Sequence, residues 1–287
     1  MNGNPGMAGP DSPNLPPAAF PFGPALLFCP ADRPDRYVKA AARSDAVILD
    51  LEDAVASADK PAARDAVAAS RLDPERTIVR VNPAGTADFE ADLAALRTTP
   101  YRSLMLPKAQ DPGDLRAVAG YGVVVLCETA AGVLNAAALA AEPNTLALMW
   151  GAEDLIASLG GTSSRGGDGA YRAVAVHARS AVLLAAAAHG KGAVDAVYLD
   201  LEDAAGLEAE ARDAAASGFA AKACIHPGQV EAVRAAFAPD PAEVAAARAL
   251  IEAAAGEAGV FRFNGRMVDE PLLRHARAVL RRAGQAG

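Results

Sequence analysis

The apolar residues of the chain fall into short continuous runs that are separated by alanine-rich segments. Eight runs occur, at residues 24–29, 46–51, 77–81, 103–107, 122–127, 145–150, 195–200 and 222–226. Continuous apolar runs are typical of strands buried on both faces, as in parallel sheets. Helical stretches lie between them, at 59–71, 86–97, 130–141 and 170–188. This alternation predicts an α/β fold, a closed (β/α)8 TIM barrel over residues 23–238. No GxGxxG motif follows the first run, which argues against an open dinucleotide-binding sheet.

One ten-residue segment occurs twice. Residues 45–54, DAVILDLEDA, return almost unchanged as DAVYLDLEDA at residues 195–204. In both copies acidic residues follow the predicted strand directly, which supports the strand count. Two copies so far apart do not indicate a solenoid.

Both ends of the chain lie outside the predicted barrel. Residues 1–22 are rich in Pro, Gly and Asn and carry no basic or long apolar segment, so we expect a disordered leader and not a signal peptide. Residues 239–287 contain a helical segment that starts after Asp240, two short strands around an Asn-Gly turn and a last helix at about 270–283. We expect this extension to pack on the barrel rim or on a neighbouring subunit.

Composition excludes several classes of partner. The net charge is −8, and no segment is dense in Lys and Arg, so nucleic acid is not expected to bind. The most apolar helical segment, residues 181–188, is too short to span a membrane. The three cysteines, Cys29, Cys127 and Cys224, each lie in a predicted strand and are interpreted as small buried hydrophobes of a reducing, cytoplasmic protein.

Almost every predicted strand ends in a polar or charged residue. In a β/α barrel the carboxyl ends of the strands meet at one rim, where catalytic groups are found. Polarity of loops in general explains some of these residues, but not a titratable group at nearly every strand. The residues are Asp32, Arg33, Asp50, Glu52, Asp53, Arg80, Asn82, Lys108, Glu128, Glu153, Asp154, Asp200, Glu202 and His226.

Glu128 and Asp154 are the best candidates for a metal site. They follow consecutive strands, so their carboxylates are expected to meet near the barrel axis. Two carboxylates with water completing the shell are a usual way to hold Mg²⁺. The alternative is a structural charge network with Arg80 and Lys108.

Arg80 is the natural partner for negative charge that develops during a reaction, since its guanidinium stays protonated. We group it with Asp50 and Glu52 as candidate catalytic residues, while a purely structural ion pair among them stays open. His226 could act as a base, although a structural role is the favoured reading.

The glycine-rich segment 160–169 is long enough to form a lid over the site. Its Arg165, together with Ser and Thr hydroxyls, could contact phosphates. Asn82 at the end of the third run is a further candidate for substrate binding.

Several motifs occur in a characteristic order: LFCPADRP, VILDLEDAV, RVNPAG, LPK, CETAAGV, MWGAEDLIASLGGTSSR and IHPGQV. They resemble the citrate lyase β-subunit-like branch of the HpcH/HpaI aldolase/citrate lyase family, near the malyl-CoA and citramalyl-CoA lyases. The resemblance runs from about residue 26 to 280. It implies a TIM barrel, homotrimers or hexamers, Mg²⁺ and substrates that are acyl-CoA or acyl-carrier thioesters. Cys29 and Ala31 depart from the usual Val and Gly and could alter the first loop.

The resemblance also assigns residues to roles. Glu128 and Asp154 match the metal ligands, and Arg80 matches the substrate arginine. Arg33 and Lys108 resemble residues near the bound thioester. In the segment at 264–271, Asp269 matches an acid/base residue that a neighbouring subunit's tail places over the site; an N-cap for the last helix is an equally sound role.

These roles imply Mg²⁺-dependent cleavage of a 3-hydroxyacyl-CoA, such as malyl-CoA or citramalyl-CoA, into acetyl-CoA and an α-keto acid, or the reverse condensation. Three alternatives stay open. They are an aldolase that acts on free hydroxy-keto acids, an acyl-CoA thioesterase variant and a non-catalytic subunit of a lyase complex.

Overall fold

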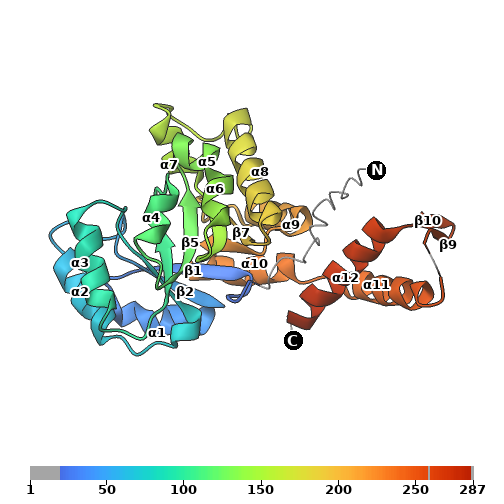
Figure 1. Cartoon of the computed structure of the whole chain (residues 1–287), viewed down its shortest axis with the longest axis horizontal. Coiled ribbons are helices and arrows are strands. Elements are labelled where there is room, and N and C mark those ends of the chain that lie inside the picture. Colours follow the sequence, from blue (N-terminus) through green and yellow to red (C-terminus); the bar gives the residue numbers. More distant parts are fainter. Residues whose placement is uncertain (1–19, 258, 286–287) are drawn as a thin grey trace, which may run out of the picture.

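The computed structural model describes residues 20–257 and 259–285 of the chain. Eight parallel strands close into a barrel, in which each strand pairs with the next and β8 pairs with β1 (Figure 1). The strands are β1 (Ala25–Pro30), β2 (Ala46–Asp50), β3 (Thr77–Arg80), β4 (Ser103–Leu106), β5 (Gly122–Cys127), β6 (Thr145–Trp150), β7 (Gly192–Asp195) and β8 (Ala221–Cys224). The predicted TIM barrel is confirmed.

Helices cover the outside of the barrel and alternate with the strands. They are α1 (Pro34–Arg43), α2 (Lys60–Ala69), α3 (Ala87–Leu96), α4 (Pro112–Arg116), α5 (Ala130–Leu134), α6 (Ala136–Ala141), α7 (Ala152–Ser158), α8 (Ala173–Ala188), α9 (Ala204–Ser217) and α10 (Val230–Phe237), with short 3-10 turns η1 (Pro74–Arg76) and η2 (Pro227–Gln229). Local capping sets where helices begin. For example, the Thr129 hydroxyl accepts a hydrogen bond from the Gly132 N–H at 3.0 Å and starts α5 directly after β5.

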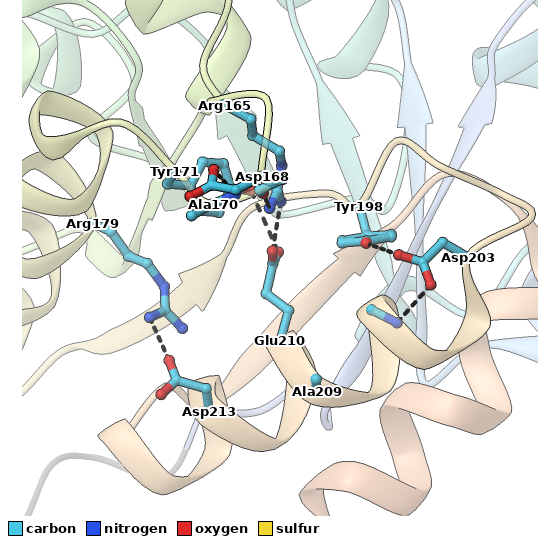
Figure 2. A pocket seen from close by; sticks show the side chains of 12 residues that line it. Arg165, Asp168, Ala170, Tyr171, Arg179, Tyr198, Asp203, Ala209, Glu210 and Asp213 are labelled. Carbon is cyan, nitrogen blue, oxygen red and sulfur yellow. Dashed lines mark hydrogen bonds and ion pairs between the residues drawn. The ribbon is translucent and has the colours of Figure 1, made fainter.

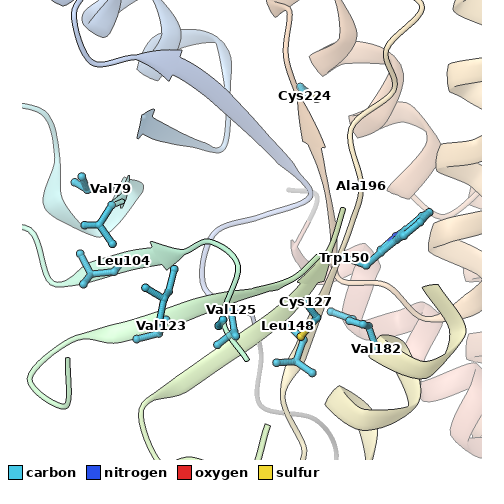
Figure 3. Packing of buried hydrophobic residues seen from close by; sticks show 14 of the residues in the cluster. Val79, Leu104, Val123, Val125, Cys127, Leu148, Trp150, Val182, Ala196 and Cys224 are labelled. Carbon is cyan, nitrogen blue, oxygen red and sulfur yellow. The ribbon is translucent and has the colours of Figure 1, made fainter. Parts of the chain in front are cut away.

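Alternation along the strands divides the buried side chains into two clusters. Successive side chains of a strand point to opposite faces, so every second residue faces the barrel interior. The interior cluster includes Leu26, Ile48, Ile78, Val124 and Met149. The strand residues between them form a second cluster with the helices. In Figure 3, Val79, Leu104, Val125 and Leu148 come from the strands and Val182 comes from α8.

The seventh strand was placed wrongly. The run at 195–200 was expected to form it, but β7 spans Gly192–Asp195 and shares only Asp195 with that run. Beyond Asp195 the chain leaves the ladder, and the Ala196 carbonyl accepts a hydrogen bond from the Lys222 ammonium at 2.7 Å. The true strand is a short Gly-Ala-Val-Asp segment, whose apolar signal is weaker than that of the run after it.

The predicted leader of residues 1–22 lies outside the described residues as far as residue 19. Its last part belongs to the folded barrel, since Phe22 is buried in the interior cluster. Phe20 packs edge-to-face on Phe22, with ring centres 5.3 Å apart.

The carboxyl-terminal extension consists of α11 (Pro241–Ala254), β9 (Phe261–Phe263), β10 (Arg266–Val268) and α12 (Glu270–Gln285). Figure 1 shows it projecting from the barrel, with the β9–β10 hairpin at its outer end. Asn264 and Gly265 both have positive φ, as the predicted Asn-Gly turn requires. Near its carboxyl end, α12 meets the barrel layer, where Arg282 donates to the Ala215 carbonyl of α9 at 3.0 Å. Among the described residues, no helix has the length and apolar character needed to cross a bilayer.

Candidate active site at the carboxyl end of the barrel

The inward-facing register of three strands carries charged residues to one place. Ile48 faces the interior and is followed at the next inward position by Asp50, and the same step leads from Ile78 to Arg80. On β5, Leu126 is followed in this way by Glu128. The apolar residues fill the barrel, so the charged ones lie above them at the rim.

A cavity of about 410 Å³ opens at this rim. Its charged lining comes from Asp50, Asp53, Arg80, Glu128, Glu153, Asp154 and Arg165. Its apolar lining includes Phe28, Leu126, Met149, Trp150, Val197, Leu199 and Ile225. The structure thus brings most of the predicted catalytic and metal-binding residues to one cavity that has both charged and apolar walls.

Glu128 and Asp154 face this cavity from different elements. Glu128 is only 2% exposed, and its Oε1 accepts a hydrogen bond from the Lys108 N–H at 3.0 Å. Asp154 lies in the first turn of α7 and is more accessible. Burial, together with the negative charges of Asp154 and Glu52, raises the pKa of Glu128 to about 8. Lys108 and Arg80 oppose this rise, and a bound cation would favour the ionised form of Glu128 further.

Gly151 allows Glu128 to take this position. A Cβ at residue 151 would stand 2.8 Å from the Glu128 Oε2 and 3.0 Å from its Cβ. A larger residue where the chain turns from β6 into α7 would therefore displace the Glu128 carboxylate.

The donor set fits a hard divalent cation. Both candidate ligands are carboxylates, the ligand type that Mg²⁺ prefers, and Mg²⁺ usually keeps water or substrate oxygens in its other positions. In the part of the chain that the structure describes, no three His, Cys, Asp or Glu side chains converge into a closed metal cage. Two carboxylates beside an open cavity are consistent with Mg²⁺ and give no support for a structural zinc site.

Arg80 is held by the two acidic residues that follow β2. Its Nε and Nη2 bind the two oxygens of Asp50 at 2.7 and 2.6 Å, and its Nη1 lies 2.9 Å from Glu52 Oε2. The guanidinium also lies over the ring of Phe28, 4.9 Å from its centre. The ion pair expected as an alternative is therefore present, and the same guanidinium still lines the cavity, with donors that Asp50 does not occupy.

Lys108 contacts acidic residues that follow β2, β5 and β6. Its ammonium contacts Glu52, lies 3.2 Å from Asp53 Oδ2 and 3.7 Å from Asp154 Oδ1. Burial opposes its charge, but the hydrogen bond to Glu52 and the surrounding carboxylates outweigh burial and raise the pKa of Lys108. Its backbone has φ of 52°, a conformation that costs energy for a residue with a side chain. This strained turn directs the Lys108 N–H at Glu128.

Two predicted substrate-binding residues lie elsewhere. Asn82 is 3% exposed and bonds to Lys60, to Asp92 at 2.7 Å and to the Leu51 carbonyl at 3.1 Å, so it fixes the chain after β3 and does not line the cavity. Arg33 also lies outside the cavity lining. It is exposed and pairs with Asp35 at 3.1 Å.

His226 caps η2, where its Nδ1 accepts a hydrogen bond from the Gly228 N–H at 3.1 Å. This contact agrees with the structural reading. Asp269 stands at the start of α12, and its carboxylate accepts from the Leu272 N–H at 3.3 Å, as an N-cap does. Within one chain Asp269 does not line the cavity.

Sequence reasoning missed Trp150 and Tyr171. Both line the cavity, with ring centres 5.2 Å apart in an edge-to-face arrangement. Trp150, the only tryptophan of the chain, ends the sixth apolar run and could have been identified as a rim residue from that position. Tyr171 lies beyond the glycine-rich segment, where no pattern in the sequence shows that the loop returns to the cavity.

Comparison with known proteins agrees with this geometry. Residues 25–227 match the family model described as HpcH/HpaI aldolase/citrate lyase. The chain is 56% identical over 264 residues to the citrate lyase subunit beta-like protein of Mycobacterium tuberculosis, an alignment that covers 92% of this chain and 97% of that protein. It is 33% identical over 287 residues to the human mitochondrial citramalyl-CoA lyase, with 88% and 83% covered.

A crystal structure of CitE from Mycobacterium tuberculosis in complex with magnesium, acetoacetate and coenzyme A superposes with a TM-score of 0.87 at 56% identity. The match covers 91% of this chain and 98% of that chain. The resemblance found in the motifs is confirmed. The chain therefore belongs to the HpcH/HpaI aldolase/citrate lyase family.

Proposed function

We propose that this protein is a Mg²⁺-dependent carbon–carbon lyase. It cleaves a 3-hydroxyacyl-CoA such as malyl-CoA or citramalyl-CoA into acetyl-CoA and an α-keto acid, or forms it by the reverse condensation. The observation that carries the proposal is the cavity in which Glu128, Asp154 and Arg80 meet beside apolar walls. The magnesium, acetoacetate and coenzyme A held by the Mycobacterium tuberculosis relative, and the name of the human relative, support it.

Glu128 and Asp154 would hold Mg²⁺. When bound, the ion supplies a Lewis acid and a template for the hydroxyl (or keto) and carboxylate oxygens of the substrate. Side chains of the protein stabilise the developing charge and transfer the proton.

Arg80 stabilises the charge that cleavage creates. The bond between C2 and C3 of the thioester breaks, the C3 hydroxyl gives its proton to water and becomes the keto oxygen, and the electron pair of the broken bond moves to the thioester as an enolate. The Arg80 guanidinium donates to that enolate oxygen. Asp50 and Glu52 fix the orientation of the guanidinium before the substrate arrives, because they hold it through contacts at 2.6–2.9 Å.

Asp269 of a neighbouring copy delivers or removes the proton at the enolate carbon. Asp269 is carried on an extension that projects from its own barrel (Figure 1), so a homotrimer or hexamer would complete the site. Arg165 acts at the cavity, Lys108 beside the lining residue Asp154, and Arg33 at the outer surface as cationic contacts for the thioester and its phosphates. Asn82 supports them indirectly, by fixing the loop after Arg80.

A substrate panel tests the reaction. The protein is incubated with malyl-, citramalyl-, citryl- and hydroxymethylglutaryl-CoA, with Mg²⁺ or EDTA, while acyl-CoA, keto acid and free thiol are measured. We expect equal amounts of acyl-CoA and keto acid from at least one substrate with Mg²⁺, and none with EDTA. Free thiol would instead indicate a thioesterase, and cleavage of free hydroxy-keto acids without CoA an aldolase. Inactivity on every substrate, with co-purifying partners, would indicate a non-catalytic subunit.

Subunit mixing tests the role of Asp269 separately. D269N and R80M are each expected to be inactive, with Mg²⁺ binding intact in D269N. After the two are dissociated and reassembled together, about a quarter of the sites should combine an intact barrel with an intact tail and recover activity. If mixing restores nothing although mixed oligomers form, the tail does not act across subunits.

A further inference from the structure

The active-site cavity shares a wall with a second cavity. This second cavity, of about 430 Å³, lies between the loop after α7 and the amino-terminal half of α9. Arg165 and Tyr171 line both cavities. These two side chains, hereafter the partition, therefore separate the proposed substrate site from a region that the reaction does not use.

The partition is held by stacking. The Arg165 guanidinium lies 3.6 Å from the centre of the Tyr171 ring and 5.2 Å from that of Tyr198. Arg165 Nη1 also donates to the Gly169 carbonyl at 3.0 Å. The loop that carries the partition contains five glycines between residues 160 and 169, and backbone hydrogen bonds from Gly166 to Ala170 and from Arg172 to Ser164, both at 2.8 Å, bring Arg165 and Tyr171 side by side in an antiparallel bridge.

Glu210 of α9 ties both members of the partition from outside the active-site cavity (Figure 2). Its Oε2 pairs with Arg165 Nη2 at 2.6 Å. Its Oε1 accepts from the Tyr171 hydroxyl at 3.4 Å and from the Lys222 ammonium at 2.8 Å. One carboxylate thus connects the loop to the base of the barrel wall.

Lys222 anchors the Glu210 carboxylate to strand β8. Its side chain is completely buried, and its ammonium also binds Asp195 Oδ2 at 3.0 Å. The other oxygen of Asp195 accepts from Trp150 Nε1 at 2.7 Å. Hydrogen bonds therefore run from Trp150, on the cavity wall, through Asp195, Lys222 and Glu210 and back to the partition.

We propose that Glu210 is a positioning residue for substrate binding, which holds Arg165 and Tyr171 against the active-site cavity without contacting the substrate itself. The proposal rests on the proposed function in taking that cavity as the thioester site. A wall that contacts the substrate equally in the ground state and the transition state affects KM and leaves kcat nearly unchanged. Loss of the Glu210 carboxylate frees the Arg165 guanidinium and the Tyr171 hydroxyl, which both line the cavity, so the effect should appear in KM.

The test compares E210Q with E208Q. Glu208 lies on the same helix and pairs with Arg212 at 2.5 Å on the surface, so E208Q removes an equal charge without touching the partition. For E210Q we expect a KM for the accepted acyl-CoA about tenfold higher, with kcat within about twofold of the wild type. E208Q should match the wild type in both.

Fluorescence of Trp150 gives a readout that does not depend on activity. Trp150 is fully buried, and its ring contacts Tyr171. Acrylamide should quench Trp150 more strongly in E210Q than in E208Q or the wild type. Wild-type KM and wild-type quenching in E210Q would overturn the proposal, as would a fall in kcat at unchanged KM.

Two further results separate the possible failures. If the wild type cleaves no acyl-CoA, the proposed function fails, and the quenching experiment alone decides the role of Glu210. If E210Q does not fold, E210D keeps a negative charge beside Lys222 while shortening the side chain that reaches Arg165 Nη2. E210D should then show a raised KM and stronger quenching, and wild-type behaviour would contradict the proposal.

Discussion

The two copies of the repeated segment, residues 45–54 and 195–204, have nearly the same sequence and different surroundings. In the first copy β2 continues to Asp50, Leu49 is 0% exposed, and Asp50 and Glu52 are buried. In the second copy β7 ends at Asp195, Leu199 is 55% exposed, and Asp200 and Glu202 are exposed. The same sequence therefore forms a strand end with buried carboxylates in one place and, in the other, a loop whose apolar residues line the cavity while its carboxylates are exposed.

The local turn is the same in both copies. The Glu52 N–H donates to Asp50 Oδ1 at 2.9 Å, and the Glu202 N–H donates to Asp200 Oδ1 at the same distance. What differs is the cations that face each copy. Arg80 and Lys108 face the first, whereas within the described residues no Lys or Arg pairs with Asp200 or Glu202. The local sequence sets the turn. Whether its carboxylates are buried and lie at the active site depends on the cations that neighbouring strands place against them.

The largest effect is expected when the first copy loses its main cation. R80M removes the guanidinium that faces the proposed enolate and leaves Asp50 without a cationic partner, as Asp200 is in the second copy within the described residues. We expect kcat/KM for the accepted acyl-CoA to fall about a thousandfold, in line with the loss of a preorganised donor. Thermal unfolding checks that the variant is folded, and a rate near that of the wild type would contradict the assigned role.

The first aspartates of the two copies, Asp45 and Asp195, should contribute differently to the unfolding free energy of the protein. Asp195 is completely buried with Lys222 and also binds Arg179, so D195N takes a fully buried carboxylate away from a fully buried ammonium and should cost about 3–5 kcal/mol of unfolding free energy, although Lys222 keeps its contact with Glu210. Asp45 pairs with the partly exposed Arg234, and D45N should cost about 1 kcal/mol or less. Urea unfolding measures both, and equal losses would contradict the comparison.

The contribution of Asp195 should also depend on pH. Burial alone would raise its pKa, but Lys222 and Arg179 outweigh burial and hold the pKa of Asp195 below its usual range. Its stabilisation is therefore complete above the ordinary aspartate pKa of about 3.9 and is lost as the pH falls through the lower folded value. The difference in stability between wild type and D195N should shrink only in that acidic window.

A smaller difference in unfolding free energy is expected between alanine variants of the matched leucines, Leu49 and Leu199. L49A deletes a fully buried side chain between β2 and the helices and should destabilise the protein by about 2–4 kcal/mol. L199A changes a side chain that is more than half exposed and should stay within about 0.5 kcal/mol. A large loss of stability in L199A would mean that this loop is covered, for instance by another subunit.

Much of the fold could be predicted because the barrel strands are continuous apolar runs that end in polar residues. The runs at 122–127 and 145–150 match β5 and β6 residue for residue. The run at 195–200 has the strand-like sequence of the first copy, yet β7 ends at Asp195, where the side chain pairs with Lys222 of β8. Local pattern does not contain that long-range pairing.

The candidate site could be predicted for the same reason at Asp50, Arg80 and Glu128, because each lies two residues after a side chain that faces the barrel interior. It was not predictable for Asn82, whose partners Lys60 and Asp92 come from two helices. Nor could the sequence show that Glu210, on α9, holds the glycine-rich loop. Contacts between elements decide these roles.

The most direct test of the account compares D50N with D200N, the matched carboxylates of the two copies. With Mg²⁺ and the acyl-CoA that the wild type cleaves, the rate of keto acid release should fall about a hundredfold in D50N. The reason is that the Arg80 guanidinium loses the bidentate partner that fixes its orientation. D200N should release keto acid at the wild-type rate within about twofold, since its carboxylate is a surface group. Equal rates in the two variants would contradict the claim that the carboxylates after β2, and not those after β7, belong to the active site.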